Sequence, residues 1–368
     1  MKPSPDKSPP VVLVPELFRL TGGVQVFSRR TIEALDEIYD RPVPVISRND
    51  RRSDCPDDFL KNRSFTGCGS LPNSLRRFAI MAASLTKACP FFFSTHPHFT
   101  PWLKLRKKPY LSVAHGIDVW NIKGSKVADG LQSADCILPV SNYTAERLRK
   151  QLGEKIPPIE VFPNTFDARR FTAIPSKTPW REDLSLPDNA QVMLSMCRVS
   201  KTESGKGYHR LLQLMPQLIK KHPKLHWVLG GKGDDLGNVK KIAADLGISS
   251  HCRFPGFIPD ETLPDLYRSS DLFALPSKKE GFGIVFLEAA ATGLPVIAGN
   301  RDGSVDALAN GALGTLIDPE SNEEISAAID KLLTSPPRNR QELHDDCTTR
   351  FGKNAFRNRL AKILSNHP

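Results

Sequence analysis

A chain of 368 residues is longer than a single hydrophobic core usually allows, so its length favours about two domains. Its 39% hydrophobic and 25% charged residues are typical of a soluble globular protein. No apolar run approaches the roughly 20 residues that cross a bilayer, and the N-terminal sequence MKPSPDKSPP lacks the apolar core of a signal peptide. The composition therefore argues against an integral membrane protein, and we expect a cytoplasmic one.

The formal net charge of +11 suits a phosphate-bearing substrate, an anionic membrane surface or a nucleic acid. In the basic N-terminal part, SLRRFAIMAASLTKACPFFF mixes Arg76, Arg77 and Lys87 with apolar residues at roughly helical spacing. This pattern is typical of a helix that lies peripherally on an anionic membrane, here the inner face. A solvated basic face over a core helix explains it as well. No nucleic acid is expected, because no aromatic platform or known module accompanies the cations.

Short apolar runs, many of them β-branched, alternate with longer segments of helical period along the whole chain. In the first half the runs predict strands at Val11–Val14, Val43–Ile46, Phe91–Ser94, Tyr110–Ala114, Cys136–Val140 and Ile159–Phe162. In the second half they predict strands at Val192–Met196, Leu225–Leu229, Cys252–Phe254, Leu272–Leu275, Val296–Ala298 and Thr315–Ile317. The helical period predicts helices at Val24–Tyr39, Tyr208–His222, Val239–Leu246 and Glu323–Leu333.

Strands that consist of continuous apolar runs are buried on both faces, as in a parallel sheet covered by helices. The alternation therefore predicts an α/β protein with two doubly wound domains. Residues 164–189 are polar and punctuated by prolines, which is typical of a linker, so we place the boundary between residues 170 and 171. In such domains ligands bind beyond the carboxyl ends of the strands.

The first strand is followed by LTGGVQVF, in which Gly22 and Gly23 permit a ligand to approach the backbone closely. A simple turn explains these glycines nearly as well, since no GxGxxG is present. The sequence VAHGID places His115 at the end of a predicted strand, where it could hydrogen-bond a substrate hydroxyl or titrate near neutral pH. A lone histidine is more often structural.

Two cations, Arg198 and Lys206, follow the strand that ends at Met196 and precede a predicted helix. Cations in this position suit the oxygens of a diphosphate, although a loop of this kind is more often merely exposed. The nearby SGKG is not a P-loop, because Gly207 replaces the required Ser or Thr.

The stretch KKEGFGIVFLEAAATGLPVIAGN predicts a turn followed by a short helix that begins at Ile284. The free amides near Gly283 and the positive end of the helix dipole would form an anion site, most naturally for phosphate. Glu288 would lie about 6–8 Å further along, since a helix rises 1.5 Å per residue, and could accept bonds from a ribose diol. Glu280 would face whatever is attached beyond the phosphate. Alternatively, both glutamates are solvated acids favoured by the helix dipole.

No metal or other cofactor is expected. The seven cysteines show no CxxC pair and are odd in number, which argues against a disulfide framework and a structural zinc site. The adjacent Asp234 and Asp235 lie in a glycine-rich loop, where such residues more often form a turn or a helix cap than a metal site.

The sequence EGFGIVFLE resembles the E-x7-E motif of the retaining GT-B-fold glycosyltransferases of family 4, also called group 1. The resemblance covers most of the chain, through GGVQ, VAHGID, VFPNTFD, LGGKGDD, FPGFIPDETLPDLYRSSDLFALPS, GLPVIAGN and GTLIDP. It implies a GT-B fold of two Rossmann-like domains facing across a cleft. Residues 1–170 would form the acceptor side and 171–345 the nucleotide-sugar side, and a C-terminal helix at 346–368 would cross back to the first domain.

The resemblance also implies roles for individual residues. Arg198 and Lys206 would hold the diphosphate, helped by the amides of Gly281, Phe282, Gly283 and Ile284. Glu288 would bind the ribose, and Phe257 and Ile258 would carry the base. Glu280 and His115 would contact hydroxyls of the donor sugar, and Gly22 and Gly23 would let the N-terminal loop approach donor and acceptor. Arg198, Lys206, Glu280 and His115 would be the catalytic group.

The implied reaction moves a hexosyl unit from a nucleotide-diphosphate sugar, UDP-linked rather than GDP-linked, to a sugar, glycan or lipid-linked acceptor with retention of configuration. Polysaccharide or glycolipid biosynthesis is the expected context. Thr165, Asp302 and Asp306 depart from the residues that the family commonly shows, so the sugar is not fixed. The alternative is a nucleotide-sugar-binding protein without turnover.

Overall fold

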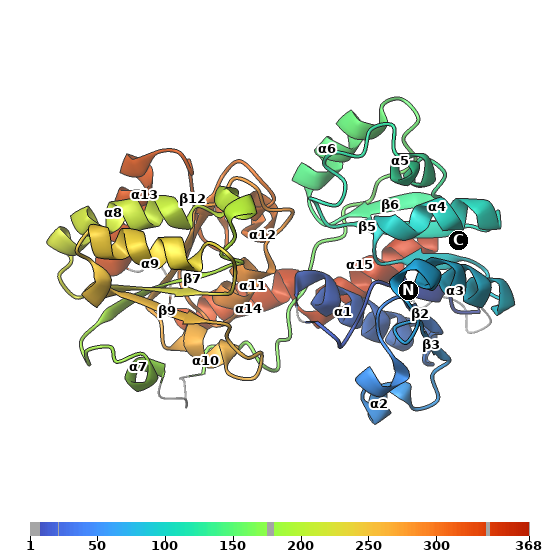
Figure 1. Ribbon diagram of the computed structural model, residues 1–368, viewed down its shortest axis with the longest axis horizontal. Coiled ribbons are helices and arrows are strands. Elements are labelled where there is room, and N and C mark those ends of the chain that lie inside the picture. Colours follow the sequence, from blue (N-terminus) through green and yellow to red (C-terminus); the bar gives the residue numbers. More distant parts are fainter. Residues whose placement is uncertain (1–7, 21, 175–179, 336–338, 368) are drawn as a thin grey trace. The chain divides into compact units, whose positions relative to one another are not determined.

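The chain forms two α/β units. The computed structural model describes residues 8–20, 22–174, 180–335 and 339–367. One unit comprises residues 1–165 with 353–368, and the other comprises residues 166–352 (Figure 1). Each contains one six-stranded sheet with parallel strand pairs. The predicted pair of doubly wound α/β domains is therefore confirmed.

The first unit has the strand order β3-β2-β1-β4-β5-β6. Its strands are β1 (Val11–Val14), β2 (Val45–Ser47), β3 (Phe65–Gly67), β4 (Phe92–Ser94), β5 (Tyr110–Ala114) and β6 (Cys136–Pro139). Its α-helices are α1 (Gly23–Tyr39), α2 (Asp57–Leu60), α3 (Asn73–Thr86), α4 (Thr100–Leu103), α5 (Lys126–Leu131), α6 (Asn142–Leu152) and α15 (Lys353–Asn366). Its 3-10 helices are η1 (Arg52–Asp54), η2 (Pro97–Phe99) and η3 (Lys104–Arg106).

The last helix, α15, belongs to the first unit although it follows the second in sequence. It packs on α1, and the two lie side by side in Figure 1. The Phe356 ring stacks on Phe162 at 4.4 Å between centroids and meets the edge of Phe27 at 5.7 Å. Burial of these rings ties the C-terminal helix to the first core, because large aromatic surfaces contribute most to packing.

The second unit has the strand order β12-β11-β10-β7-β8-β9. Its strands are β7 (Gln191–Met196), β8 (Leu225–Gly230), β9 (Cys252–Gly256), β10 (Leu272–Leu275), β11 (Val296–Gly299) and β12 (Thr315–Ile317). Its α-helices are α7 (Trp180–Asp183), α8 (Tyr208–Lys221), α9 (Leu236–Asp245), α10 (Leu263–Arg268), α11 (Ile284–Ala291), α12 (Ser304–Ala307), α13 (Asn322–Thr334) and α14 (Arg340–Phe351). Its 3-10 helices are η4 (Lys201–Lys206), η5 (Ser249–His251) and η6 (Ala309–Gly311).

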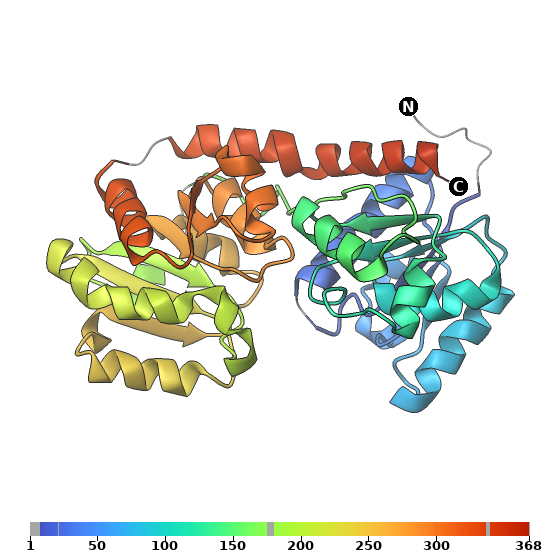
Figure 2. The ribbon, with the colours of Figure 1, turned by 90° about the horizontal axis from the view of Figure 1, so that it is seen from above.

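Helices cover both faces of the second sheet (Figure 2). Along β10, Leu272 and Ala274 join a core cluster with residues of α8, α9 and α13. Phe273, which points to the opposite face, meets Tyr267 of α10 and Phe286 of α11 at 5.8 Å each. Because successive side chains of a strand alternate between faces, an apolar β10 supplies both cores at once.

The sequence expectations differ from the structure at two edge positions. The predicted strand at Ile159–Phe162 is wrong, since Ile159 forms only an isolated bridge with Ile137. Prolines flank this segment at Pro158 and Pro163, and a proline donates no ladder hydrogen bond. Conversely, β3 was not predicted, because this three-residue edge strand is half-exposed and has no apolar run.

In the polar stretch expected as a linker, residues 166–174 and 180–189 belong to the second unit, whose first residue is Phe166, and residues 175–179 lie outside the described residues. The ring of Phe171 lies 6.0 Å from that of Tyr267. The indole of Trp180 donates to the carbonyl of Thr262 at 3.1 Å. Aromatic side chains therefore fix a segment whose prolines and charges are typical of a loop. In the C-terminal region, the second unit ends at Gly352 and the chain returns to the first unit at Lys353.

Candidate active site

The carboxyl ends of β7 and β10 lie side by side in the second unit. Strand order reverses between them, and open α/β sheets bind ligands at such a switch point. The loop after β7 carries Arg198 and η4, and the loop after β10 carries the turn that precedes α11. The amide of Lys278 donates to the carbonyl of Gly205 at 2.9 Å, which joins the two loops.

Lys206 and Glu280 form an ion pair across these loops. Their Nζ and Oε1 atoms are 2.6 Å apart, and the side chains are only 18% and 12% exposed. Burial disfavours the charged form of Lys206, but the carboxylates of Glu280 and Glu203 outweigh it and raise the pKa of the ammonium. Lys206 is therefore a fixed positive charge at neutral pH.

The backbone at Gly207 explains why SGKG ends in glycine. Its φ is +83°, and a Cβ there would lie 2.2 Å from the carbonyl oxygen of Pro276. Only glycine fits such a position without displacing backbone. Gly207 therefore holds Lys206 at the end of β10.

A buried carboxylate, Asp302, organises the turn after β10. Its Oδ2 accepts from the Ser277 hydroxyl at 2.8 Å and from the amide of Glu280 at 2.7 Å, and its Oδ1 accepts from the amide of Ser304 at 2.9 Å. Burial raises the pKa of this carboxyl, although its hydrogen bonds oppose the change. Asp302 thus positions the Glu280 backbone, which gives a structural reason for its presence at this unusual place.

The N-terminus of α11 presents unpaired backbone amides. In the described part of the chain, the N–H groups of Gly283, Ile284 and Val285 have no acceptor. Gly283 has φ +86°, and its position directs the chain into the helix. The Phe282 side chain is 2% exposed and packs edge-on against Phe351, so only its backbone faces the site. The arrangement can bind an anion.

Glu288 lies one turn further along α11 and is 8% exposed. Its Oε2 accepts from the Tyr267 hydroxyl at 3.0 Å. Burial raises the pKa of Glu288 to about 7, with Asp260 adding to the rise and Tyr267 and Arg170 opposing it. The carboxyl therefore changes charge near neutral pH, and its Oε1 has no partner among the described residues.

The other predicted residues of the second unit differ in exposure. Arg198 is 72% exposed and pairs with Glu203 at 3.0 Å, a surface contact that a ligand could displace at small cost. Phe257 is 50% exposed, and the ammonium of Lys232 lies 4.4 Å from its ring centre. Ile258 is buried at 5%, so its side chain belongs to the core.

The remaining predicted residues, Gly22, Gly23 and His115, lie in the first unit. The His115 Nε2 is 2.8 Å from the carbonyl of Thr95. A carbonyl only accepts, so Nε2 carries the proton and Nδ1 is left as an acceptor for a substrate hydroxyl. Gly22 precedes α1, and a Cβ there would meet only the end of the Gln25 side chain, at 2.8 Å.

Comparisons with known proteins place this geometry in a family. Residues 176–352 match the family model described as Glycosyl transferases group 1. The chain carries a group 1 glycosyltransferase domain. That domain lies within the second unit, which contains the Lys206–Glu280 pair and α11.

Two curated relatives and one solved structure resemble this chain. The GDP-mannose-dependent alpha-(1-6)-phosphatidylinositol monomannoside mannosyltransferase of Mycolicibacterium smegmatis is 32% identical over 213 residues, covering 56% of this chain and 54% of that protein. Mannosylfructose-phosphate synthase of Agrobacterium fabrum is 28% identical over 208 residues, covering 54% and 45%. HepE of Anabaena in complex with UDP superimposes with a TM-score of 0.76 at 18% identity, covering 97% of this chain and 100% of that one.

The structural likeness shows that the chain has the GT-B fold, as the sequence resemblance implied. The chain spans about half the length of the two curated relatives. Among the described helices, none has both the length and the apolar character needed to cross a bilayer.

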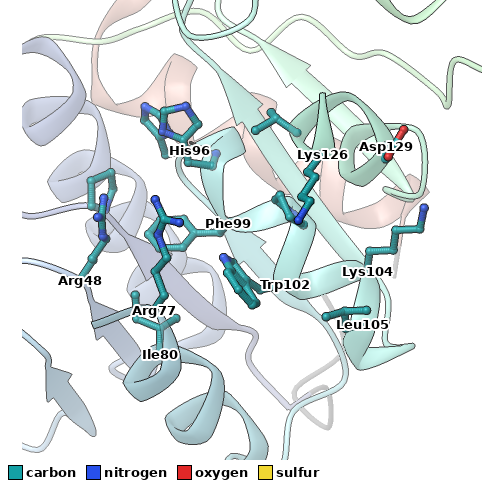
Figure 3. Close-up of a pocket in the computed structure, with 14 residues that line it drawn as sticks. Arg48, Arg77, Ile80, His96, Phe99, Trp102, Lys104, Leu105, Lys126 and Asp129 are labelled. Atoms are coloured by element: carbon teal, nitrogen blue, oxygen red, sulfur yellow. Dashed lines mark hydrogen bonds between the residues drawn. The ribbon is translucent and has the colours of Figure 1, made fainter. Parts of the chain in front are cut away.

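A pocket of about 810 Å³ lies at the carboxyl ends of β1, β2 and β4 in the first unit (Figure 3). Its walls come from the loops after these strands and from α3, η2, α4, η3 and α5. The lining is rich in cations and aromatic rings, among them Arg48, Arg77, Trp102, Lys104 and Lys126. The strand order also reverses here, between β1 and β4.

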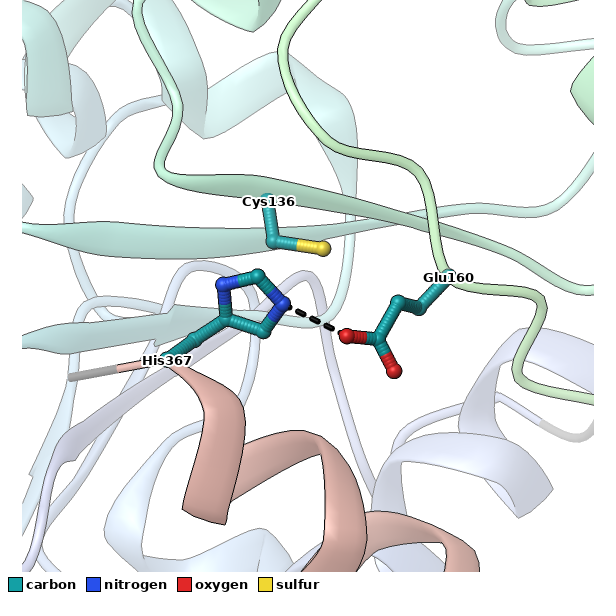
Figure 4. A group of neighbouring side chains, drawn as sticks. All are labelled: Cys136, Glu160 and His367. Carbon is teal, nitrogen blue, oxygen red and sulfur yellow. Dashed lines mark hydrogen bonds and ion pairs between the residues drawn. The ribbon is translucent and has the colours of Figure 1, made fainter.

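Among the described residues, Cys136, Glu160 and His367 form one cluster whose ligand atoms lie within 4.8 Å of one another (Figure 4). The imidazole Nε2 of His367 lies 2.6 Å from Glu160 Oε1, and the Cys136 thiol donates to the carbonyl of Ile137 at 3.6 Å. Burial, and next the charge of Glu160, raises the pKa of Cys136 to about 12, so the thiol stays protonated near neutral pH. These contacts explain the cluster without an ion.

Sequence reasoning missed three contributors to this geometry. Tyr267 and Glu203 carry no motif, and Asp302 was noted only as a departure from the family pattern. The sequence did contain a signal for a partner such as Tyr267, because Glu288 lies in the apolar run IVFLEAAA and a buried glutamate needs a hydrogen-bond partner. The basic composition of the N-terminal part was the one sequence feature that pointed to the cationic pocket of the first unit.

Proposed function

We propose that this chain transfers a hexosyl unit from a nucleotide-diphosphate sugar to a carbohydrate or lipid-linked acceptor, with retention of the anomeric configuration. The observation that carries the proposal is the buried Lys206–Glu280 pair beside the free amides of α11. A fixed cation and aligned N–H groups at a switch point suit a diphosphate leaving group.

The chemistry follows from these charges. The bond between the anomeric carbon and the diphosphate oxygen breaks, and Lys206, Arg198 and the amides of Gly283 and Ile284 stabilise the negative charge that develops on the phosphates. The acceptor oxygen bonds to the same face of the sugar and passes its proton to the departing phosphate oxygen. Glu280 is neutralised by Lys206 and therefore suits a hydrogen-bond acceptor for sugar hydroxyls better than a covalent nucleophile.

Further residues of the second unit contact the rest of the donor in this proposal. Glu288 accepts bonds from the ribose diol, and the exposed ring of Phe257, with the backbone of Ile258, contacts the base. For the first unit we keep the roles that the family resemblance implies, namely His115 for a sugar hydroxyl and Gly22 and Gly23 for the approach of substrates. No metal is assigned, because Lys206 and the helix end supply the positive charge.

GDP-mannose and UDP-hexoses are both donor candidates. The name of the Mycolicibacterium smegmatis relative supports GDP-mannose, and that of the HepE complex supports a uridine nucleotide. We favour GDP-mannose, because the relative is 32% identical and HepE only 18%. The expected preference for UDP is the alternative that a direct comparison tests.

The test is a product screen with GDP-mannose, UDP-glucose and UDP-galactose, run with and without EDTA. We expect one donor to raise the melting temperature and to yield an α-linked product that EDTA does not reduce. A donor that stabilises the protein but gives neither transfer nor hydrolysis would instead support the nucleotide-sugar-binding alternative. An inverted product would refute retention.

We also propose that the first unit contacts an anionic membrane. Helix α3 exposes Leu75, Phe78 and Leu85 at 50%, 59% and 58%, and the adjoining η3 exposes Leu105 at 66%. Arg106 of η3 donates to a carbonyl of α3, at 3.3 Å, so the two helices share one surface. We call these four apolar residues the α3 surface.

The cations next to the α3 surface favour an anionic membrane as its partner. Arg77 precedes Phe78 in α3 and Lys104 precedes Leu105 in η3, and apolar residues flanked by cations bind acidic lipid headgroups. Vesicles of phosphatidylglycerol and phosphatidylcholine should sediment the wild type, and the double variant Phe78→Ser/Leu85→Ser should bind at least tenfold less. The matched control is Ile174→Ser, because Ile174 is an apolar residue of the second unit that is 62% exposed. Equal binding to pure phosphatidylcholine would refute the proposal.

A further inference from the structure

The pocket of the first unit combines a concentrated positive charge with apolar walls. Its volume of about 810 Å³ falls within the roughly 300–1,000 Å³ of small-molecule sites. Phe99, Trp102 and Leu105 supply apolar surface. Such a surface suits the faces of a sugar or polyol ring, while the cations suit an attached anion.

Among the described residues that line the pocket, four are permanent cations and one is a carboxylate. The cations are Arg48, Arg77, Lys104 and Lys126, and the carboxylate is Asp129. Arg77, Lys104 and Lys126 have no ion-pair or hydrogen-bond partner among the described residues. Several cations that line one pocket beside a single carboxylate create a positive potential there, and such a potential attracts anionic ligands.

Arg48 is the most telling of these cations. Its Nε is buried and unpaired within the described chain, and its Nη2 donates only to the neutral side chain of Asn73, at 3.1 Å. Burial lowers the pKa of Arg48, the charges of Arg77 and Arg76 lower it further, and Glu16 alone opposes them. A bound anion would relieve this repulsion.

The histidine His96 lies beside these cations in an environment that favours its neutral form. His96 lines the pocket, and burial together with His115, His98 and Arg48 holds its pKa well below the usual range. Its Nε2 lies 3.9 Å from Asp118, which is too far for a hydrogen bond. The His96 ring lies 6.1 Å from that of His115, so the pocket adjoins the histidine assigned to the sugar.

We infer that this pocket binds the acceptor through a phosphate ester carried by a sugar or polyol. A phosphate matches several converging cations better than a carboxylate does, because it offers more charge and more acceptor oxygens. Arg48, Arg77 and Lys126 hold the phosphate, and Trp102 contacts the ring that carries it. The inference rests on the proposed transfer reaction, since it names the class of molecule that receives the sugar.

Direct binding tests the site without any reaction. Isothermal titration of the full chain with myo-inositol 1-phosphate and fructose 6-phosphate should show saturable binding, and myo-inositol and fructose should bind at least tenfold more weakly. Arg77→Gln and Lys126→Gln should each weaken phosphate-ester binding about tenfold, the effect of losing one charge-assisted hydrogen bond. Neither side chain has a partner in the part of the chain that the structure describes, so the variants should fold as the wild type does.

The matched control is Lys155→Gln, an exposed lysine of the first unit outside the pocket. It should bind both phosphate esters like the wild type. Vesicles that contain phosphatidylinositol, compared with phosphatidylglycerol vesicles of equal charge, separate a lipid headgroup from a soluble phosphate ester as the source of the phosphate. Equal affinity for phosphorylated and unphosphorylated compounds, or unchanged affinity in both pocket variants, would overturn the inference.

Donor measurements separate this inference from the proposed function. Arg77→Gln should keep the donor-induced rise in melting temperature and the rate of donor hydrolysis, while KM for the acceptor rises about tenfold. If donor binding and hydrolysis are absent in the wild type but phosphate esters bind, the proposed function fails and the pocket assignment stands. If donor is turned over and phosphate esters do not bind, the pocket assignment alone fails.

Discussion

At the scale of single residues, Lys206 and Glu280 set the charge of the proposed donor site. Each would be costly to bury alone, and together they place a cation and a carboxylate 2.6 Å apart beside α11. Glu203 is a second carboxylate 3.8 Å from Lys206, so the ammonium is held from two sides. A diphosphate that binds here meets an ammonium already fixed in position.

Replacing Lys206 by methionine should mainly slow turnover. The variant keeps the length of the side chain but removes the charge that stabilises the leaving diphosphate, so kcat should fall about 10²–10³-fold, as when one oxyanion donor is lost. Donor Kd should rise less, because the α11 amides remain. Lys201→Met, on the same 3-10 helix but exposed, should leave kcat unchanged. Equal kinetics of Lys206→Met and wild type would remove Lys206 from the site.

Glu288 should make donor binding depend on pH around neutrality. Its folded-state pKa is about 7, raised from 4.5 mainly by burial. If the carboxylate receives the ribose diol, donor Kd should fall about tenfold from pH 6 to pH 8, since only the ionised fraction binds. Calorimetry with GDP-mannose suits this measurement, because its diphosphate diester does not titrate in that range.

The matched variant Glu288→Gln cannot ionise, so its donor Kd should stay constant across that range. The same raised pKa makes the free energy of unfolding fall as the pH rises, whereas donor binding strengthens. Glu288 contributes stability that is fully present below about pH 4.5 and is lost as the pH rises through about 7. Identical pH profiles of donor binding in wild type and variant would contradict the ribose assignment.

At the scale of elements, the turn after β10 and the helix α11 act as one device. Asp302 fixes the amides of Glu280 and Ser304, and the left-handed backbone of Gly283 redirects the chain into the helix. The amides at the helix start therefore have a defined direction before any ligand arrives. Preorganised donors are worth more to a developing charge than donors that must first turn toward it.

Alanine at position 283 should disturb this device. The left-handed φ of +86° is unfavourable for alanine, and its Cβ would lie 2.5 Å from the Phe286 ring. Gly247→Ala is the matched control, because Gly247 has φ +68° and no atom within 4 Å of a Cβ. Both variants should lose about 1 kcal/mol of unfolding free energy from the backbone term, and Gly283→Ala alone should also weaken donor binding. Calorimetric melting and donor titration measure the two effects.

The sequence predicted the turn and α11 well, but it did not predict the contacts that other elements make with them. Gly-Phe-Gly before an apolar run identified a helix start with free amides, because glycine and helix periodicity are local signals. The pairing of Lys206 with Glu280 depends on the alignment of β7 beside β10, which only the folded sheet determines. The Tyr267 contact to Glu288 also joins residues on different helices, α10 and α11. The predicted strand at 159–162 failed where prolines limited pairing.

At the scale of the whole molecule, the residues assigned to the two proposed sites lie in two different units. The second unit holds the residues assigned to the nucleotide and diphosphate, and the first holds His115 and the cationic pocket. Each unit has its own six-stranded sheet, so each can respond to its own ligand. A ligand that contacts one core should suppress local opening there.

Hydrogen exchange should therefore separate the two sites in the intact protein. GDP or UDP, whichever binds, should slow exchange at residues 197–207 and 283–288, where the proposed phosphate and ribose contacts lie. The same nucleotide should leave the pocket loops at 96–105 unchanged, and a polyol phosphate should have the reverse effect. The corresponding nucleoside, which lacks phosphates, is the control and should protect residues 197–207 much less. Protection of the pocket loops by nucleotide alone, with none at 197–207, would place the donor in the first unit and contradict the assignment of both sites.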